Sequence, residues 1–120
     1  MIIVSKCGVN WRVSSKGQRA ATFRDCSPDH IRFSVEASLR RLRIESIPVY
    51  LLHWPDPKTP IEESVDALLQ CKKDGKIRSF GFSNFCLDSL IRVRDMVDTA
   101  VVEVPYSLLE RSAGADVIPY

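Results

Sequence analysis

Short apolar runs alternate with longer amphipathic stretches along this chain of 120 residues. The apolar runs cover residues 2–5, 47–52, 77–82 and 101–104. They are rich in β-branched and aromatic residues, and they are apolar throughout rather than alternating with polar positions. Such runs are typical of strands that are covered on both faces. The pattern therefore predicts four short, buried β-strands.

The stretches between these runs carry helix signals. Ser27 followed by Pro28 is typical of a helix start, with serine as the N-cap and proline at the first helical position. Apolar residues then recur at helical spacing from Ile31 to Leu42. The pattern predicts a first helix that begins at residue 28.

Two further helices follow the second and third apolar runs. Residues 59–62 read Thr-Pro-Ile-Glu, which predicts a capping box, and Gly75 predicts the end of that helix. A third helix is expected over about residues 87–97, and the tail from about residue 114 to residue 120 is expected to start another. Residues 8–27 show no clear period and are expected to be irregular.

The order strand, helix, strand, helix, strand, helix, strand predicts right-handed βαβ units with a parallel sheet. The fold class is therefore α/β. Two architectures fit, a doubly wound sheet or part of a (β/α)8 TIM barrel, and periodicity alone does not choose between them. In both, functional residues gather just past the C-terminal ends of the strands.

Composition and charge narrow the class of protein. The chain is 45% hydrophobic and 27% charged, with a net charge of +2 and scattered basic residues, so no nucleic-acid partner is expected. No apolar run is long enough to span a membrane, so no membrane partner is expected. The four cysteines show no metal-binding spacing. They are interpreted as reduced thiols, and a cytoplasmic location is expected.

Polar residues follow the predicted strands at their C-terminal ends. Lys6 follows the first strand, His53 the second, and Ser83 with Asn84 the third, while Glu103 lies at the end of the fourth. Because parallel strands end at one edge of a sheet, these side chains are expected to converge on one opening.

The segments VSKCG, SVEASLRRL, YLLHWPDP, GKIRSFGFSNF and VPYSLLER occur in this order along nearly the whole chain. In this series the sequence resembles the aldo-keto reductase family. The resemblance favours the barrel over the doubly wound sheet. It implies hydride transfer between NADPH and an aldehyde or ketone, a small-molecule carbonyl substrate.

The resemblance also implies roles for single residues. Lys6 matches the catalytic lysine, whose charge lowers the pKa of a proton-donating tyrosine. His53 matches the catalytic histidine, which orients and polarises the carbonyl. Ser83 and Asn84 match the pair that binds the nicotinamide carboxamide. Glu103 stands where the family usually has glutamine, and its carboxylate can accept hydrogen bonds from an amide but cannot donate them.

The family's tyrosine, its aspartate partner and its phosphate-binding segments have no counterpart in this chain. A (β/α)8 barrel takes about 250 residues. The chain is therefore interpreted as a single partial domain over residues 1–120, from the third strand to the start of the sixth helix. Four strands cannot close a barrel, so the fragment alone is expected to be inactive and open to self-association through its sheet edges.

Other interpretations remain open. The chain could be a non-catalytic half-barrel that binds a partner, or a different barrel enzyme that uses His53 and Glu103 as an acid–base pair. His53 could pack beside Trp54, and Ser83 with Asn84 could cap a helix. Tyr106 could be a packing residue. No metal site is expected.

Overall fold

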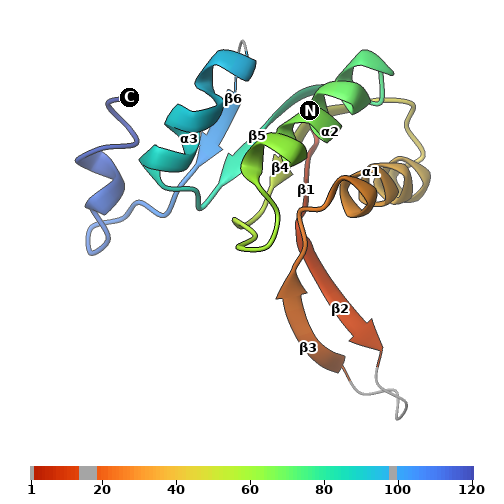
Figure 1. The fold of residues 1–120 in the computed structure, drawn as a ribbon, viewed down its shortest axis with the longest axis horizontal. Helices are drawn as coiled ribbons and strands as arrows, with labels where there is room; N and C mark the ends of the chain where they lie inside the picture. Colours follow the sequence, from red (N-terminus) through yellow and green to blue (C-terminus); the bar gives the residue numbers. More distant parts are fainter. Residues whose placement is uncertain (1, 14–18, 98–99) are drawn as a thin grey trace.

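The computed structural model of this chain describes residues 2–13, 19–97 and 100–120 (Figure 1). One sheet contains four parallel strands in the order β1-β4-β5-β6. Their bounds are Val4–Cys7 for β1, Ile47–Leu52 for β4, Ile77–Ser83 for β5 and Ala100–Glu103 for β6. The predicted fold class is confirmed: the molecule is α/β, built from parallel βαβ units, and fits a partial (β/α)8 barrel.

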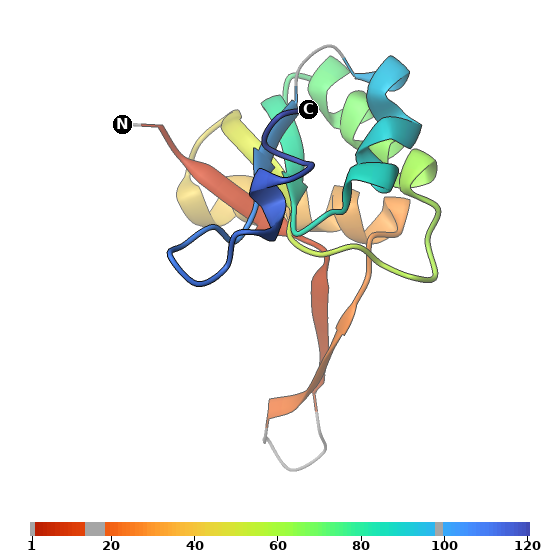
Figure 2. The same ribbon diagram turned by 90° about the vertical axis from the view of Figure 1, so that its left-hand side faces the viewer.

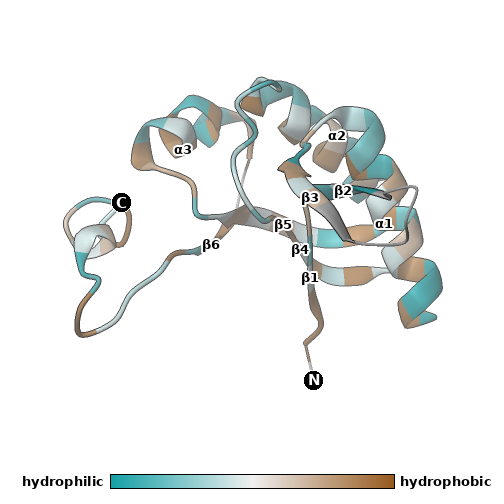
Figure 3. Cartoon of the chain, turned by 90° about the horizontal axis from the view of Figure 1, so that it is seen from below, coloured by the Kyte–Doolittle hydropathy of each residue, from teal (hydrophilic) through white to brown (hydrophobic). Residues whose placement is uncertain are grey.

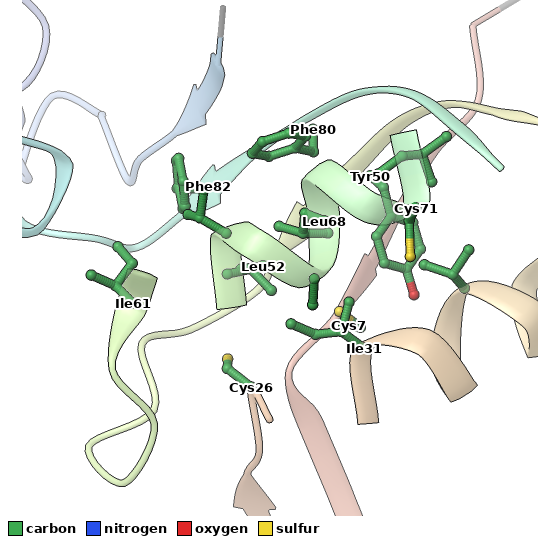
Figure 4. Packing of buried hydrophobic residues seen from close by; sticks show 14 of the residues in the cluster. Cys7, Cys26, Ile31, Tyr50, Leu52, Ile61, Leu68, Cys71, Phe80 and Phe82 are labelled. Atoms are coloured by element: carbon green, nitrogen blue, oxygen red, sulfur yellow. The ribbon is translucent and has the colours of Figure 1, made fainter. Parts of the chain in front are cut away.

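Three helices connect these strands and lie on one side of the sheet (Figure 3). They are α1 (Pro28–Leu42), α2 (Ile61–Lys73) and α3 (Leu87–Val93), and α2 packs against both of the others. The helix-facing side of the sheet carries Tyr50, Leu52, Phe80 and Phe82, all at most 2% exposed. Leu68 of α2 lies over this cluster (Figure 4). Burying these apolar side chains is the main force that fixes the helices on this face.

The start of α1 is confirmed as predicted. The Ser27 hydroxyl accepts a hydrogen bond from the backbone N–H of His30, and Pro28 is the first helical residue. The end of α2 is also confirmed, because Gly75, the residue after the C-cap Asp74, adopts a φ of 75°. In that left-handed conformation glycine carries no penalty for a Cβ atom.

The predicted capping box at the start of α2 is wrong. The N-cap position is Pro60, and no side chain makes a capping hydrogen bond there. The Thr59 hydroxyl instead donates to Oδ2 of Asp56 at 2.8 Å. Asp56 lies nearby and offers a charged acceptor, which binds a hydroxyl more strongly than a neutral group does.

The prediction that residues 8–27 are irregular is also wrong. Two antiparallel strands, β2 (Val9–Val13) and β3 (Arg19–Arg24), form a hairpin there. The hairpin leaves the C-terminal end of β1 and projects away from the sheet and helices (Figures 1 and 2). Because it packs on no core, its strands carry exposed polar residues, which obscured them in the sequence.

The C-terminal part differs from the prediction at two points. The α-helix α3 ends at Val93, and a 3-10 turn over Arg94–Met96 continues it. The tail does not start an α-helix at residue 114; it forms a 3-10 turn, Ser112–Gly114, that ends there. Among the apolar side chains of residues 113–120, Ala113 is buried and Val117 is partly buried against the core, while the others are exposed, so a helix there would gain little stability by packing. No helix in the described ranges is long and apolar enough to cross a membrane.

Candidate active site

The register of the sheet brings the predicted polar residues to one face and one edge. Lys6 is paired with Leu51, and Ser83 with Glu103, across the strands. Tyr50 and Leu52 face the helices, so these four residues lie on the opposite, helix-free face, because side chains alternate along a strand. His53 follows two residues after Leu51 at the same edge. The strand register thus brings these polar residues together at one opening, as the sequence predicted.

An ion pair spans this opening. The ammonium group of Lys6 donates to Oε1 of Glu103. Lys6 is on β1 and Glu103 on β6, the outermost strands of the sheet, so the pair reaches over β4 and β5. The hydrogen bond and positive charge of Lys6 lower the pKa of the Glu103 carboxyl. The Glu103 carboxyl is therefore ionised at neutral pH, and it accepts the Lys6 hydrogen bond above the sheet.

Asn84 connects three strand ends. Its side-chain Nδ2 donates to the carbonyl oxygen of His53 at 2.9 Å and to Oγ of Ser83 at 3.0 Å. Its backbone N–H donates to the carbonyl oxygen of Glu103 at 3.0 Å. Its φ of 62° lies in the left-handed region, which asparagine tolerates better than most residues.

The alternative in which Ser83 and Asn84 cap the next helix is not what the structure shows. The N-cap of α3 is Cys86, and no side chain makes a capping hydrogen bond there. Ser83 is 1% exposed, and its hydroxyl lies 3.5 Å from Oε1 of Glu103. The two residues therefore belong to the polar network at the strand ends.

His53 begins a loop that is held by hydrogen bonds and a ring contact. Its backbone N–H donates to the carbonyl oxygen of Cys7 at 2.8 Å, and its ring centroid lies 6.0 Å from that of Trp54. The Cys26 thiol donates to the Trp54 carbonyl oxygen at 3.4 Å. Burial raises the pKa of this thiol to about 12, so it stays protonated and remains a donor. His53 therefore packs beside Trp54 and also lies at the opening, so the two interpretations of this residue are compatible.

Asp56 organises the same loop. Its carboxylate accepts hydrogen bonds from the backbone N–H groups of Cys26 and Lys58, both at 2.9 Å, and from Thr59. Burial raises the pKa of Asp56, but these hydrogen bonds outweigh burial and the net shift is downward. The bond from the Cys26 N–H also connects this loop to the residues after the hairpin.

A cavity of about 390 Å³ adjoins the polar network. Trp54 and Asn84 line it on the side of the opening, and Val104, Pro105 and Val117 contribute apolar surface. The cavity lies next to the strand ends, where the fold class places binding sites.

Tyr106 and the second histidine, His30, lie outside this network. Tyr106 is 48% exposed, and the Arg111 guanidinium carbon lies 4.6 Å from its ring centroid, so it packs on the tail. His30 belongs to α1 and contacts Asn10 and Ser34. Within the described ranges, no three His, Cys, Asp or Glu side chains are grouped to hold a metal ion.

Comparison with known proteins identifies the class of protein. The profile of the Aldo/keto reductase family matches residues 1–120. The chain is 33% identical over its whole length to aldo-keto reductase YhdN of Bacillus subtilis (strain 168), and 32% identical over 99% of its length to an NADH-specific methylglyoxal reductase of Escherichia coli (strain K12). This chain belongs to the aldo/keto reductase family.

A solved structure supports the same assignment. The glycerol dehydrogenase AKR11B4 from Gluconobacter oxydans superimposes with a TM-score of 0.92 and 40% identity, over 99% of this chain and 36% of that chain. This chain spans 34% and 39% of the lengths of the Bacillus and Escherichia relatives. The matched region is therefore about a third of a typical relative.

One functional candidate was missed in the sequence. Arg24, at the end of β3, places its guanidinium carbon 5.2 Å from the Trp54 ring centroid. The apolar positions Val9, Trp11 and Val13 alternate with polar ones, which is the strand signal that could have revealed the hairpin.

Proposed function

We propose that these residues form part of the active site of an oxidoreductase that reduces an aldehyde or ketone with NADPH. The observation that supports this best is the shared network of Lys6, His53, Ser83, Asn84 and Glu103 at the ends of four parallel strands. Bound NADPH supplies a hydride to the carbonyl carbon. The residues of this chain then have to orient the carbonyl and direct a proton to its oxygen.

Each residue has a role in this proposal. The His53 ring donates a hydrogen bond to the carbonyl oxygen and polarises it. The Lys6 cation lowers the pKa of a proton-donating tyrosine, a residue with no counterpart among these 120 positions. In this structure Glu103 already neutralises that cation.

The polar groups suit a nicotinamide carboxamide, which carries one acceptor oxygen and one NH2 donor. Asn84 and Ser83 can each donate and accept. Glu103 can only accept, and it is bonded to Lys6. Ser83 is therefore complementary to both ends of the carboxamide, and Glu103 only to its NH2 end. Asn84 already donates both Nδ2 protons, to His53 and Ser83, and offers its Oδ1 as an acceptor for the NH2 group.

Substitutions at these groups test cofactor binding. Fluorescence titration with NADPH, and with NADH in parallel, should show about 3- to 10-fold weaker binding for Asn84→Ala, the effect of removing one or two ligand hydrogen bonds. Glu103→Gln should bind more tightly, because an amide can donate as well as accept. Glu63→Gln is the matched control, since Glu63 is exposed on α2 and does not line the 390 Å³ cavity. Equal affinities for all four chains would refute the assignment.

Turnover is expected to need residues beyond these 120. The chain alone should oxidise NADPH with a simple aldehyde at a negligible rate, because the proton donor is not among its matched motifs. Robust turnover that Lys6→Met abolishes would contradict this expectation. It would also show that another group in the chain donates the proton.

A further inference from the structure

The Arg24 side chain joins the hairpin to the loop that begins at His53. The Arg24 guanidinium carbon lies 5.2 Å from the centroid of the Trp54 ring, and Nη1 donates to the carbonyl oxygen of Pro55 at 3.3 Å. Trp54 and Pro55 directly follow His53. One guanidinium thus contacts both the ring and the backbone of this loop.

The guanidinium has no competing acidic partner in the described ranges. The ion pairs there join other residues, and no carboxylate oxygen lies within 4.0 Å of an Arg24 nitrogen. Arginine stacks well on an indole because its guanidinium is planar and weakly hydrated. The position of Arg24 is therefore set by the Trp54 ring and the Pro55 carbonyl.

The backbone that carries Arg24 is fixed against the same loop. The Asp25 N–H donates to the carbonyl oxygen of Gly8 at 3.2 Å, and the Cys26 N–H donates to Oδ2 of Asp56 at 2.9 Å. Gly8 has a φ of 97°, and a Cβ atom there would lie 3.0 Å from Sγ of Cys26. These contacts fix the backbone at Asp25 and Cys26, and with it the position from which the Arg24 side chain reaches Trp54.

Trp54 connects this contact to the candidate active site. Its ring lies beside that of His53, and it lines the 390 Å³ cavity together with Asn84. Trp54 is 37% exposed, so packing on the core alone does not fix its position. We propose that Arg24 is a positioning residue, which holds the Trp54 indole between His53 and this cavity and so shapes the wall that meets the substrate.

The effect on the substrate rests on the proposed function, but the contact between Arg24 and Trp54 can be tested without cofactor or substrate. The chain has two tryptophans, so a Trp11→Phe background leaves Trp54 as the only indole. In that background Arg24→Met keeps the length of the side chain and removes its charge and donors. Arg12→Met is the matched control, because Arg12 lies over Phe23, at 5.5 Å, on the same hairpin.

Acrylamide quenching of Trp54 fluorescence is the measurement. An exposed cation–π contact corresponds to a roughly two- to fivefold population difference, so Arg24→Met should raise the quenching constant about twofold. Arg24→Lys should restore part of the protection, and Arg12→Met should leave it unchanged. Urea unfolding of every variant identifies the folded chains to compare.

The results decide the proposal in either direction. Equal quenching in Arg24→Met and the background would overturn it. So would equal increases in Arg24→Met and Arg12→Met, because a general loosening of the hairpin would then be the cause. If Arg24→Met does not fold, Arg24→Lys must show a higher quenching constant than the Trp11→Phe background. A failure of NADPH binding would leave this test unaffected, so the two proposals can fail separately.

Discussion

Lys6 and Glu103 form an ion pair whose partners stand on the outermost strands of the sheet. The pair uses a carboxylate at the position where the resembled family usually has an amide. The carboxylate neutralises the charge of the lysine, and unlike an amide it can only accept hydrogen bonds. At the scale of one residue, Glu103 therefore changes both the charge and the donor set of the opening.

A titration can test this pair. Replacing Lys6 with methionine should raise the pKa of Glu103 toward its ordinary value, because the hydrogen bond and the charge that lower it are removed. The measurement is the carbon-13 shift of the Glu103 carboxyl as a function of pH. Lys76→Met is the control, since Lys76 pairs with Glu36. An unchanged Glu103 pKa in Lys6→Met would show that the pair does not persist in solution.

The elements that the sequence predicted well are those with a strong local signal. The strand β4 was predicted at its observed bounds, because a run from Ile47 to Leu52 is apolar at nearly every position. The start of α1 was predicted from Ser27 and Pro28. The convergence of the candidate residues followed from the parallel order, because strand ends in such a sheet share one edge.

Other elements depended on contacts that are distant in the sequence. The capping box failed because Thr59 bonds to Asp56, and Asp56 also bonds to Cys26, which lies 30 residues earlier. The hairpin packs on no core and lacks a strong apolar run. The contact between Arg24 and Trp54 joins two segments whose proximity no local pattern encodes.

The loop between β4 and α2 should depend on the ionised form of Asp56. Asp56→Asn should lower the free energy of unfolding at pH 7 by about 1–2 kcal/mol, because three hydrogen bonds to a carboxylate become weaker. The measurement is urea denaturation. Asp66→Asn is the control, since Asp66 is exposed on α2, and it should change little.

The pH dependence of this effect has a defined sign. The folded-state pKa of Asp56 is lowered, so its contribution is present above the unfolded pKa, about 3.9. It is lost as the pH falls from there through the folded pKa. The penalty of Asp56→Asn should therefore shrink at pH 3. A penalty of equal size at pH 3 and pH 7 would show that charge on Asp56 is not involved.

At the scale of the whole molecule, the sheet has two edges without a strand partner in the described ranges, at β1 and β6. Its helix-free face is also incompletely covered, since Val4 is 50% and Val101 40% exposed. Edge strands with free backbone groups and exposed apolar side chains are sites of association between chains. We therefore expect the isolated 120-residue chain to self-associate through these edges as its concentration rises.

Sedimentation velocity over a concentration series measures this association. Val4→Lys places a charge on the edge strand β1 and should shift the chain toward monomer. The tail offers a rival surface, because Leu108 is 93% and Leu109 98% exposed. Leu109→Lys should leave association through the sheet edges unchanged. If only Leu109→Lys disperses the oligomer, the tail and not the sheet edge joins the chains, and a monomer at every concentration would contradict both surfaces.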